Sequence, residues 1–393
     1  MTAPPPELLI SLIRDDALFR LQRRIGLIPE NGLGLFRRAV FFALLGWLPI
    51  AVWAAVTGHA LPGGAIGEPL LRHFGVHVRF LLAVPLLILG EGAAHALSTR
   101  LVPYFQTSGL VREDQRPQFR QIIEDTVRLR NSTLPWIILG GLIFAALWLQ
   151  PPFRDEHELI WANVGEAARF DLGFGGWWMA YVARPIFVAL IGAWLWRIVL
   201  LFVLLKRIAG LDLQIVPTHP DKAGGLGFLE KLPSAFSLFA FAISAVVASR
   251  LAHDVMYHGA HVENLKGVLA VFLILVILLC LAPLLVFAPR LGAARKQALL
   301  DYGALVGEHG RLVHRRWIER EPVENDGLLA APELGPVADT VGLYEAVAGM
   351  RTVPVGKAAL LSVALPAAIP MVALAALEIP VKDILLKILG LLA

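Results

Sequence analysis

The sequence is poor in cysteine and in charge, and it lacks the motifs of several large enzyme families. Its one cysteine, Cys280, excludes a disulfide framework and a thiolate metal cluster. Charged residues make up 17% of the chain, whereas soluble domains carry about 25%. Without a GxSxG or HExxH motif the sequence points to no enzyme class, and it identifies no cofactor. No basic patch is interleaved with base-stacking aromatic residues, which argues against nucleic-acid binding.

Apolar residues are abundant, at 57% of the chain, and the mean hydropathy is +0.67, as in membrane proteins. A helix needs about 20 apolar residues to span the hydrocarbon of a bilayer. Seven segments approach or meet that length. They are 39–56, 80–97, 134–149, 181–205, 234–252, 265–287 and 358–377. We therefore predict an all-α polytopic transmembrane bundle of about seven spans, in which the third segment is short and flanked by prolines.

Lysine and arginine accumulate in alternate loops. They number 25 in residues 1–38, 98–133, 206–233 and 288–357, and seven in the intervening loops and the C-terminal tail. Cytoplasmic loops carry such an excess of positive charge. The pattern predicts a multi-pass protein of the bacterial inner membrane with a cytoplasmic N-terminus and the lipid bilayer as its principal partner.

Four regions follow from this topology. They are a cytoplasmic N-terminal region 1–38, a six-span core 39–289, a cytoplasmic helical and loop segment 290–357, and the last span with its tail 358–393. Residues 7–25 repeat apolar positions at helical spacing, with arginines on the other face, which predicts an interfacial helix on the inner leaflet. The final VKDILLKILGLLA is a second amphipathic run.

Several stretches carry a family resemblance. They include LQRRIGLI, RRAVFFALLGWLPI, LLILGEGAAHALSTRLVPYFQTSGLV, RLRNSTLPW, PTHPDKAGGLGFL, MRTVPV and LEIPVKDILLKILGLLA. Together they resemble a family of uncharacterised bacterial polytopic inner-membrane proteins with an HPDxAGGLGFL element. The resemblance implies an inner-membrane protein and supplies no functional residues. The chain departs from the family at LLAAPELGPVADT, where a Ser/Asp/Gln-rich segment is expected.

Two charges fall deep inside predicted spans. Glu91 and Arg197 lie about 11 and 12 residues from the outer ends of their spans, which places both roughly 16–18 Å deep. A charge at the bilayer centre costs about 2.5–3.5 kcal/mol if left alone. We expect the two to pair or to line one polar cavity, with His95 extending the path inward and Arg184 adding a further charge. A structural ion pair between helices is the alternative.

The densest polar cluster is the inner elbow 217–229, PTHPDKAGGLGFL. Its glycines and a lysine could form a nest for an anion or ion, although no strand precedes them and no phosphate-loop spacing is met. The alternative is a packed bend with a capping aspartate. The candidate ligand residues are His219, Asp221, Lys222, Gly224, Gly225 and Gly227.

A third cluster occurs in the predicted outer turn SRLAHDVMYHGAHVEN. Its spacings of three and four residues could direct side chains to one divalent metal. The candidate ligands are His253, Asp254, His258 and His261. Histidines in wet loops commonly bind nothing, and Gly259 is expected to end the helix there.

Three functional classes remain open. A channel- or transporter-like protein would use the intramembrane charges to pass a small ion or anionic ligand. An envelope structural, sensory or assembly protein would use segment 290–357, and Gly140–Gly141 suggests homo-oligomers. A membrane enzyme acting on lipid phosphate would bind it through Arg184, Arg197 and the HPDK loop.

Overall fold

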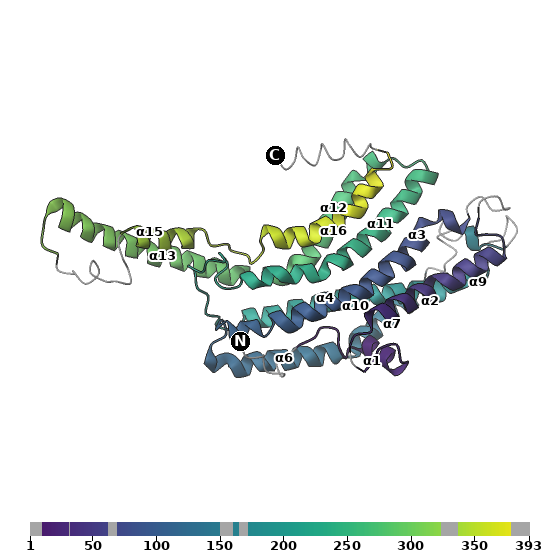
Figure 1. The fold of residues 1–393 in the computed structure, drawn as a ribbon, viewed down its shortest axis with the longest axis horizontal. Coiled ribbons are helices and arrows are strands. Elements are labelled where there is room, and N and C mark those ends of the chain that lie inside the picture. Colours follow the sequence, from purple (N-terminus) through teal and green to yellow (C-terminus); the bar gives the residue numbers. More distant parts are fainter. Residues whose placement is uncertain are drawn as a thin grey trace.

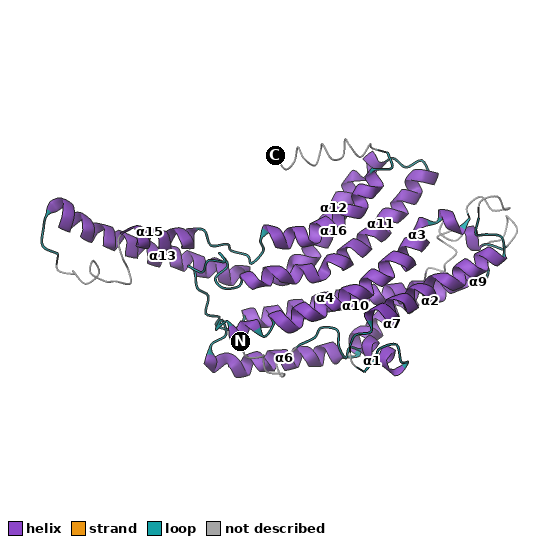
Figure 2. Ribbon diagram, viewed as in Figure 1, coloured by secondary structure: helices purple, strands orange, loops and turns teal. Residues whose placement is uncertain are grey.

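The computed structural model of the chain describes residues 10–30, 32–61, 69–149, 160–164, 172–323 and 337–378. Within these ranges the regular structure is helical, and only isolated β-bridges join extended residues (Figure 2). Six helical stretches in the described chain are long and apolar enough to cross a membrane. They are Leu35–Val56, Phe74–Thr107, Phe174–Ala209, Gly227–Tyr257, Val262–Leu285 and Lys357–Ala375. The chain is therefore a multi-pass, all-α membrane protein.

These stretches are assembled from the following helices. They are α2 Leu35–Val56, α3 Phe74–His77, α4 Val84–Leu101, α5 Tyr104–Thr107, α9 Phe174–Trp178, α10 Arg184–Ala209, a 3₁₀ helix Gly227–Phe236, α11 Ser237–Tyr257, α12 Val262–Leu285 and α16 Lys357–Ala375. π-Helical turns, Val78–Ala83 and Met179–Ala183, precede α4 and α10. Each lies just before a proline, Pro85 or Pro185, at the start of the following helix. Proline lacks an N–H and its ring clashes with the preceding turn, so the helix widens there.

The helices run between two ends of one bundle (Figure 1). At one end, called the basic end because Lys206, Arg207 and Arg290 lie there, α4 and α10 finish and Arg290 donates to the carbonyl of Gly210. The helix α2 begins part-way along the bundle, where Leu35 lies against Gly92 of α4. At the opposite end, Trp161 packs edge-on against Trp53 near the finish of α2. The pairs α2–α4, α10–α12 and α11–α16 pack against each other.

The predicted third span forms α7, Leu134–Leu149. Its 16 residues make a helix of about 24 Å, shorter than the roughly 30 Å of bilayer hydrocarbon. Among the described residues α7, which follows α6, Arg116–Asn131, is therefore not one of the six candidate spans, and a seventh crossing stays a prediction.

The N-terminal segment, residues 10–28, differs from the predicted surface helix. Its helix α1 covers only Ala17–Arg24, and the preceding residues turn without forming a helix. Ile10 and Ile13 are fully buried, and Phe19 of α1 is buried as well. The apolar side chains of Ile10, Ile13 and Phe19 are thus covered by protein, whereas Leu21 and Ile25 are more than half exposed. The predicted C-terminal amphipathic run lies outside the described residues.

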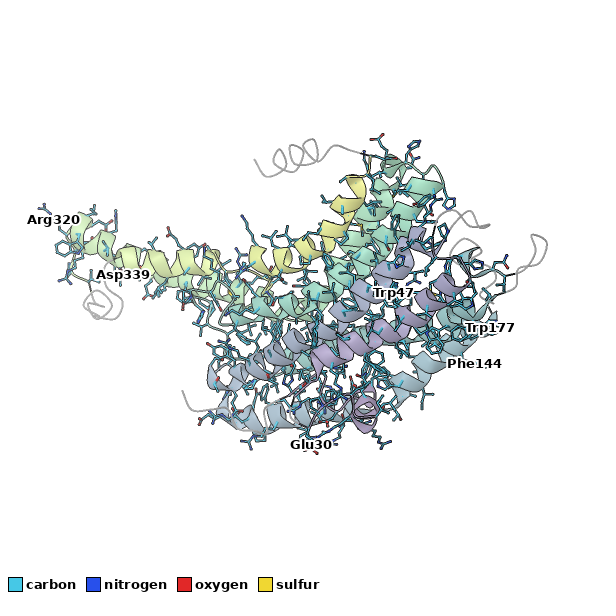
Figure 3. All side chains as sticks on the ribbon, turned by 45° about the vertical axis from the view of Figure 1, so that its right-hand side comes forward. Glu30, Trp47, Phe144, Trp177, Arg320 and Asp339 are labelled. Carbon is cyan, nitrogen blue, oxygen red and sulfur yellow. The ribbon has the colours of Figure 1, made fainter. Side chains whose placement is uncertain are left out.

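A helical arm projects from the basic end (Figure 1). It consists of α13, Ala288–Val313, a π-helical turn His314–Glu319, and α15, Val337–Ala348, which packs on α13. Figure 3 places Arg320 and Asp339 on this arm, far from Trp47 and Trp177 in the bundle. The remaining short 3₁₀ helices are Leu70–Arg72, Glu113–Gln115 and Ile160–Ala162.

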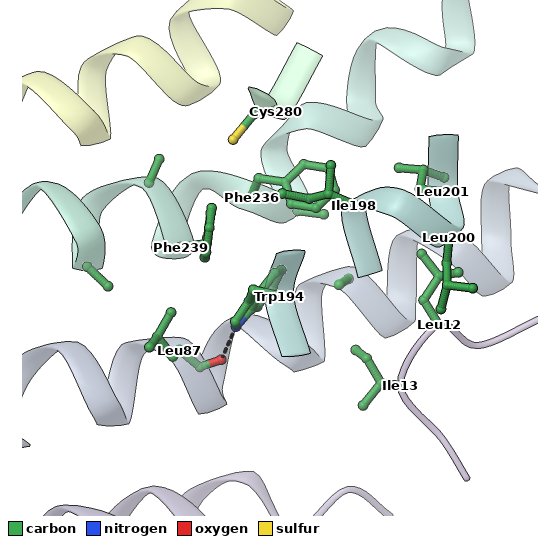
Figure 4. Close-up of a cluster of buried hydrophobic side chains, with 14 of the residues drawn as sticks. Leu12, Ile13, Leu87, Trp194, Ile198, Leu200, Leu201, Phe236, Phe239 and Cys280 are labelled. Carbon is green, nitrogen blue, oxygen red and sulfur yellow. Dashed lines mark hydrogen bonds between the residues drawn. The ribbon is translucent and has the colours of Figure 1, made fainter. Parts of the chain in front are cut away.

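The centre of the bundle is apolar around Trp194, which is fully buried. Its ring stacks on Phe239 at 5.4 Å between centroids, and its Nε1 donates to the carbonyl of Leu87 at 3.0 Å (Figure 4). Cys280 is buried in the same core. This packing fixes α10 against α4 and thereby sets the positions of Glu91 and Arg197.

Candidate functional site

The two charges inside the spans form an ion pair. Arg197 Nη2 lies 2.8 Å from Glu91 Oε1, so α10 and α4 present these side chains to each other as their matched depths predict. Arg38, the fourth residue of α2, holds the other carboxylate oxygen of Glu91, with its Nη1 2.6 Å from Oε2. Glu91 therefore accepts from two guanidinium groups carried by two other helices.

The N-terminal segment completes this network. Asp16 Oδ2 lies 3.3 Å from Arg197 Nη2, and Gln22 Oε1 accepts from Arg38 Nε at 2.5 Å. Asp16 also caps α1, since its Oδ1 accepts from the N–H of Phe19 at 2.7 Å. Burial raises the pKa of Asp16, and this effect outweighs the lowering by Arg197 and by the N–H of Phe19. We call Asp16, Gln22, Arg38, Glu91 and Arg197 the polar network.

The polar network is closed to solvent. Arg38, Glu91, Arg197 and Asp16 are each at most 3% exposed. Two arginines and two carboxylates balance in formal charge, which is what makes such burial tolerable. The hydrogen bonding of the network is incomplete, because Nε and Nη1 of Arg197 are buried without a hydrogen-bond partner. The guanidinium also lies over the ring of Trp194, 5.4 Å from its centroid, a favourable cation–π geometry.

His95 connects the N-terminal segment to α4. Its Nδ1 lies 2.8 Å from Oγ of Ser11, whose carbonyl accepts from Nη1 of Arg130 at 2.5 Å. The path from Glu91 toward the basic end is thus occupied by chain rather than left open. Arg184 is not part of the network, since it begins α10 about 20 Å along the axis from Arg197.

Arg38, Asp16 and Gln22 are the members that sequence reasoning missed. The sequence pattern places Arg38 in the cytoplasmic loop because it precedes the apolar run, yet α2 begins three residues earlier. Asp16 stands directly before ALFRLQRR, which is the pattern of a helix N-cap and was the available signal. Nothing in the sequence indicated that this cap would reach α10.

The inner elbow forms a tight turn around Asp221. Its Oδ1 accepts from the N–H groups of Ala223 (2.8 Å) and Gly225 (3.2 Å), and its Oδ2 from Gly227 (2.7 Å). Burial raises the pKa of this carboxyl, but the three backbone bonds outweigh it and leave the pKa lowered. His219 Nδ1 is 2.9 Å from Oδ1. The carboxylate thus organises the bend itself, and ligand binding by the elbow stays a prediction.

Other contacts lock the elbow in place. Gly224 and Gly225 have φ of 65° and 94°, which favours glycine, and Lys222 adopts φ 56°. The N–H of Arg351 donates to the carbonyl of Lys222 at 2.7 Å, and its guanidinium pairs with Glu230. The elbow is therefore held by the segment that leads into α16.

The predicted metal cluster is not assembled. No group of three or more His, Cys, Asp and Glu side chains in the described residues could hold a metal ion. Gly259, at φ 68°, follows the end of α11 and turns the chain away. His261 then lies 3.3 Å from Glu378 beyond α16, while His253 stacks on His73. The rings of His253 and His258 lie 5.2 Å apart between centroids, but the helix ends before His261, so the four predicted ligands do not converge on one point.

Comparison of the chain with protein-family models, curated proteins and solved structures gave no match. The geometry of the polar network is consequently the basis for a functional proposal.

Proposed function

We propose that the chain is a channel- or transporter-like protein of the bacterial inner membrane, with its N-terminus in the cytoplasm. The route for a small ion or anionic ligand runs between α2, α4 and α10. The N-terminal segment closes this route in the conformation described above. The observation that carries the proposal is the buried chain of charges from Asp16 through Arg197 and Glu91 to Arg38, of which the last three lie on the membrane-spanning helices α10, α4 and α2.

The burial of charge in the polar network costs free energy. Each ion removed from water is destabilising by several kcal/mol, and well-packed apolar residues can replace a buried ion pair without loss of stability. Ionisable side chains inside a membrane are accordingly rare, and they mark ion or substrate pathways. The polar network contains four charged side chains, and the cost of removal from water arises for each of them. Stability alone is a weak reason for it, whereas a pathway requires such groups.

The position of the N-terminal segment supports a closed state. Ser11 contacts His95 of α4, Asp16 contacts Arg197 of α10, and Gln22 contacts Arg38 of α2. One segment therefore makes a polar contact with each helix that lines the proposed route. Gly26 and Gly34, both at positive φ, flank its connection to α2 and provide positions where the backbone can change direction.

Flux measurements on purified protein in liposomes test the proposal. The probes are pyranine for protons, lucigenin for chloride and radiolabelled formate for a small organic anion. Asp16→Asn retains a capping side chain but loses the charge that holds Arg197, so we expect at least tenfold faster flux of one probe than with the unmodified protein. Adding Glu91→Gln should remove that increase.

A matched surface pair provides the control. Asp125 and Arg207 lie 3.6 Å apart and are 38% and 44% exposed, so Asp125→Asn removes the same kind of charge outside the network. It should leave the flux at the level of the unmodified protein. The proposal fails if correctly folded Asp16→Asn protein passes none of the three probes faster than empty liposomes.

The arm favours a second candidate, a role in envelope assembly. Leu300, Trp317 and Ile318 on the arm are each about 70% exposed, although they are large and apolar. Exposed apolar side chains of this kind mark interaction surfaces when they form a patch. If copies of the chain associate through the arm, Trp317→Ser with Ile318→Ser should lower the mass of the detergent-solubilised particle. Val216→Ser, at a loop residue 48% exposed, is the control. An unchanged mass would remove this candidate.

A further inference from the structure

We infer that the guanidinium of Arg197 is a binding site for a small carboxylate anion, and that Asp16 occupies this site in the closed protein. The inference rests on the proposed function and gives it a ligand class. It is carried by the hydrogen bonding of Arg197, by the charge balance of the polar network, and by the origin of Asp16 in a separate segment.

Arg197 is under-used as a donor. Its Nη2 serves both Glu91 at 2.8 Å and Asp16 at 3.3 Å, while its Nε and Nη1 are buried with no hydrogen-bond partner in the described structure. A guanidinium binds a carboxylate best through two parallel N–H bonds. Asp16 makes a single long contact, because its other oxygen is engaged by the N–H of Phe19. A free carboxylate has no such constraint and can take the Nη2 N–H that Asp16 uses together with one adjacent unused donor, Nε or Nη1.

The charge balance selects the sign of the ligand. With Asp16 in place, the carboxylates of Asp16 and Glu91 balance the guanidiniums of Arg38 and Arg197. Withdrawal of Asp16 leaves one uncompensated positive charge in a site that excludes water. Buried charge without a partner is strongly destabilising, so the vacated site favours one small anion. The ring of Trp194 lies beneath the guanidinium of Arg197 and keeps this planar group oriented toward the vacated site.

Asp16 belongs to a tethered segment and not to a membrane helix. A tethered group competes with a free ligand at an effective concentration on the order of millimolar or above. The N-terminal segment is also anchored by the buried side chains of Ile10, Ile13 and Phe19. Free anions therefore bind weakly to the unmodified protein and more tightly once the carboxylate of residue 16 is removed.

Chemical rescue tests this inference. Asp16→Ser keeps a hydroxyl that can cap α1, and it vacates the space of the carboxylate. Thermal unfolding of the purified full-length variant in detergent is followed in sodium formate and in sodium chloride at equal ionic strength. We expect formate, and not chloride, to raise the midpoint in a saturable manner, with an apparent affinity at least tenfold higher than for the unmodified protein.

Two further variants make the result specific. Asp125→Ser, at the surface pair with Arg207, should show no difference between formate and chloride. Asp16→Ser combined with Arg197→Met should lose the formate effect. Equal midpoints of Asp16→Ser in the two salts would overturn the inference.

Purification in formate covers the case in which Asp16→Ser does not fold in chloride. Recovery of folded protein only in formate supports the site, and failure in both salts counts against it. Formate rescue without flux in any variant would retain the site and refute transport. Flux through Asp16→Asn without formate rescue of Asp16→Ser would refute the site and retain transport.

Discussion

Asp16 and Arg197 are 181 positions apart in the chain, yet Oδ2 of one lies 3.3 Å from Nη2 of the other. Asp16 begins a short helix outside the spans, and Arg197 lies in the middle of α10. This contact joins the N-terminal segment to the interior of the bundle, so changes at Asp16 are expected to act on buried charges.

Glu91→Gln should strongly destabilise the protein. The substitution leaves the guanidiniums of Arg38 and Arg197 buried with too little negative charge, a situation that costs about 3–5 kcal/mol. Unfolding in mixed micelles measures the loss. Asp125→Asn at the exposed Arg207 pair should cost at most about 1 kcal/mol. Similar losses for the two variants would contradict the assignment of Glu91 to a dry network.

Asp221→Asn should destabilise the elbow at neutral pH by about 1–3 kcal/mol, since an amide cannot accept all three backbone N–H bonds. The lowered pKa of Asp221 fixes the sign of the pH dependence. The stabilisation by this carboxylate is complete above the ordinary aspartate pKa of 3.8 and is lost as pH falls through the lower pKa of the folded state. Thermal midpoints at neutral and acid pH measure both effects.

Asp212→Asn is the matched control for the elbow. Asp212 is 68% exposed and lies 3.5 Å from Arg112, so its removal should change the midpoint little. Faster amide hydrogen exchange at Gly225 and Gly227 in Asp221→Asn would locate the loss in the elbow. Unchanged exchange there would show that the carboxylate does not hold the bend.

Gly46→Val should separate α2 from the π-helical turn Val78–Ala83 that precedes α4. A Cβ at position 46 would lie 2.6 Å from Cδ1 of Phe80, so the helices cannot keep their spacing. Overpacking of this kind costs about 1–3 kcal/mol. Gly140→Val on α7 meets no atom within 4 Å of its Cβ and should cost less. Partial recovery in Gly46→Val with Phe80→Leu would confirm the contact, and no recovery would contradict it.

Trp194→Phe should cost about 1 kcal/mol, because the carbonyl of Leu87 loses a donor while most of the ring stacking is retained. The variant should also weaken the formate effect proposed for Arg197, since phenyl is a poorer cation–π partner than indole. Trp177→Phe, at a site 48% exposed, is the control. Equal midpoints for the two variants would argue against the buried hydrogen bond.

The membrane helices were predictable because long apolar runs leave the backbone few options. The seven predicted segments correspond to the helices α2, α4, α7, α10, α11, α12 and α16. Several of these helices are longer than predicted or are preceded by a short helical turn. The matched depths of Glu91 and Arg197 follow from the fixed rise of a helix. Boundaries were less predictable, and the beginning of α2 placed Arg38 inside the helix rather than before it.

The sequence pattern alone was insufficient to predict how the candidate metal ligands are arranged and what covers the predicted surface helix. His253 and His261 are close in sequence, but a helix end between them directs the chain toward Glu378. Residues 7–25 have an amphipathic pattern that suits a membrane surface and a protein surface equally. Only the neighbouring helices decide which of the two covers the apolar side chains.

By itself the sequence determined that this chain is a helical membrane protein, because hydrophobicity and helical rise are local properties that persist in any packing. The tertiary structure decided which charges meet. The pairing of Asp16 with Arg197 and of Arg38 with Glu91 depends on the relative placement of four separate elements. That placement arises from packing between elements far apart in the chain, and it cannot be derived from the spacing of residues along the sequence.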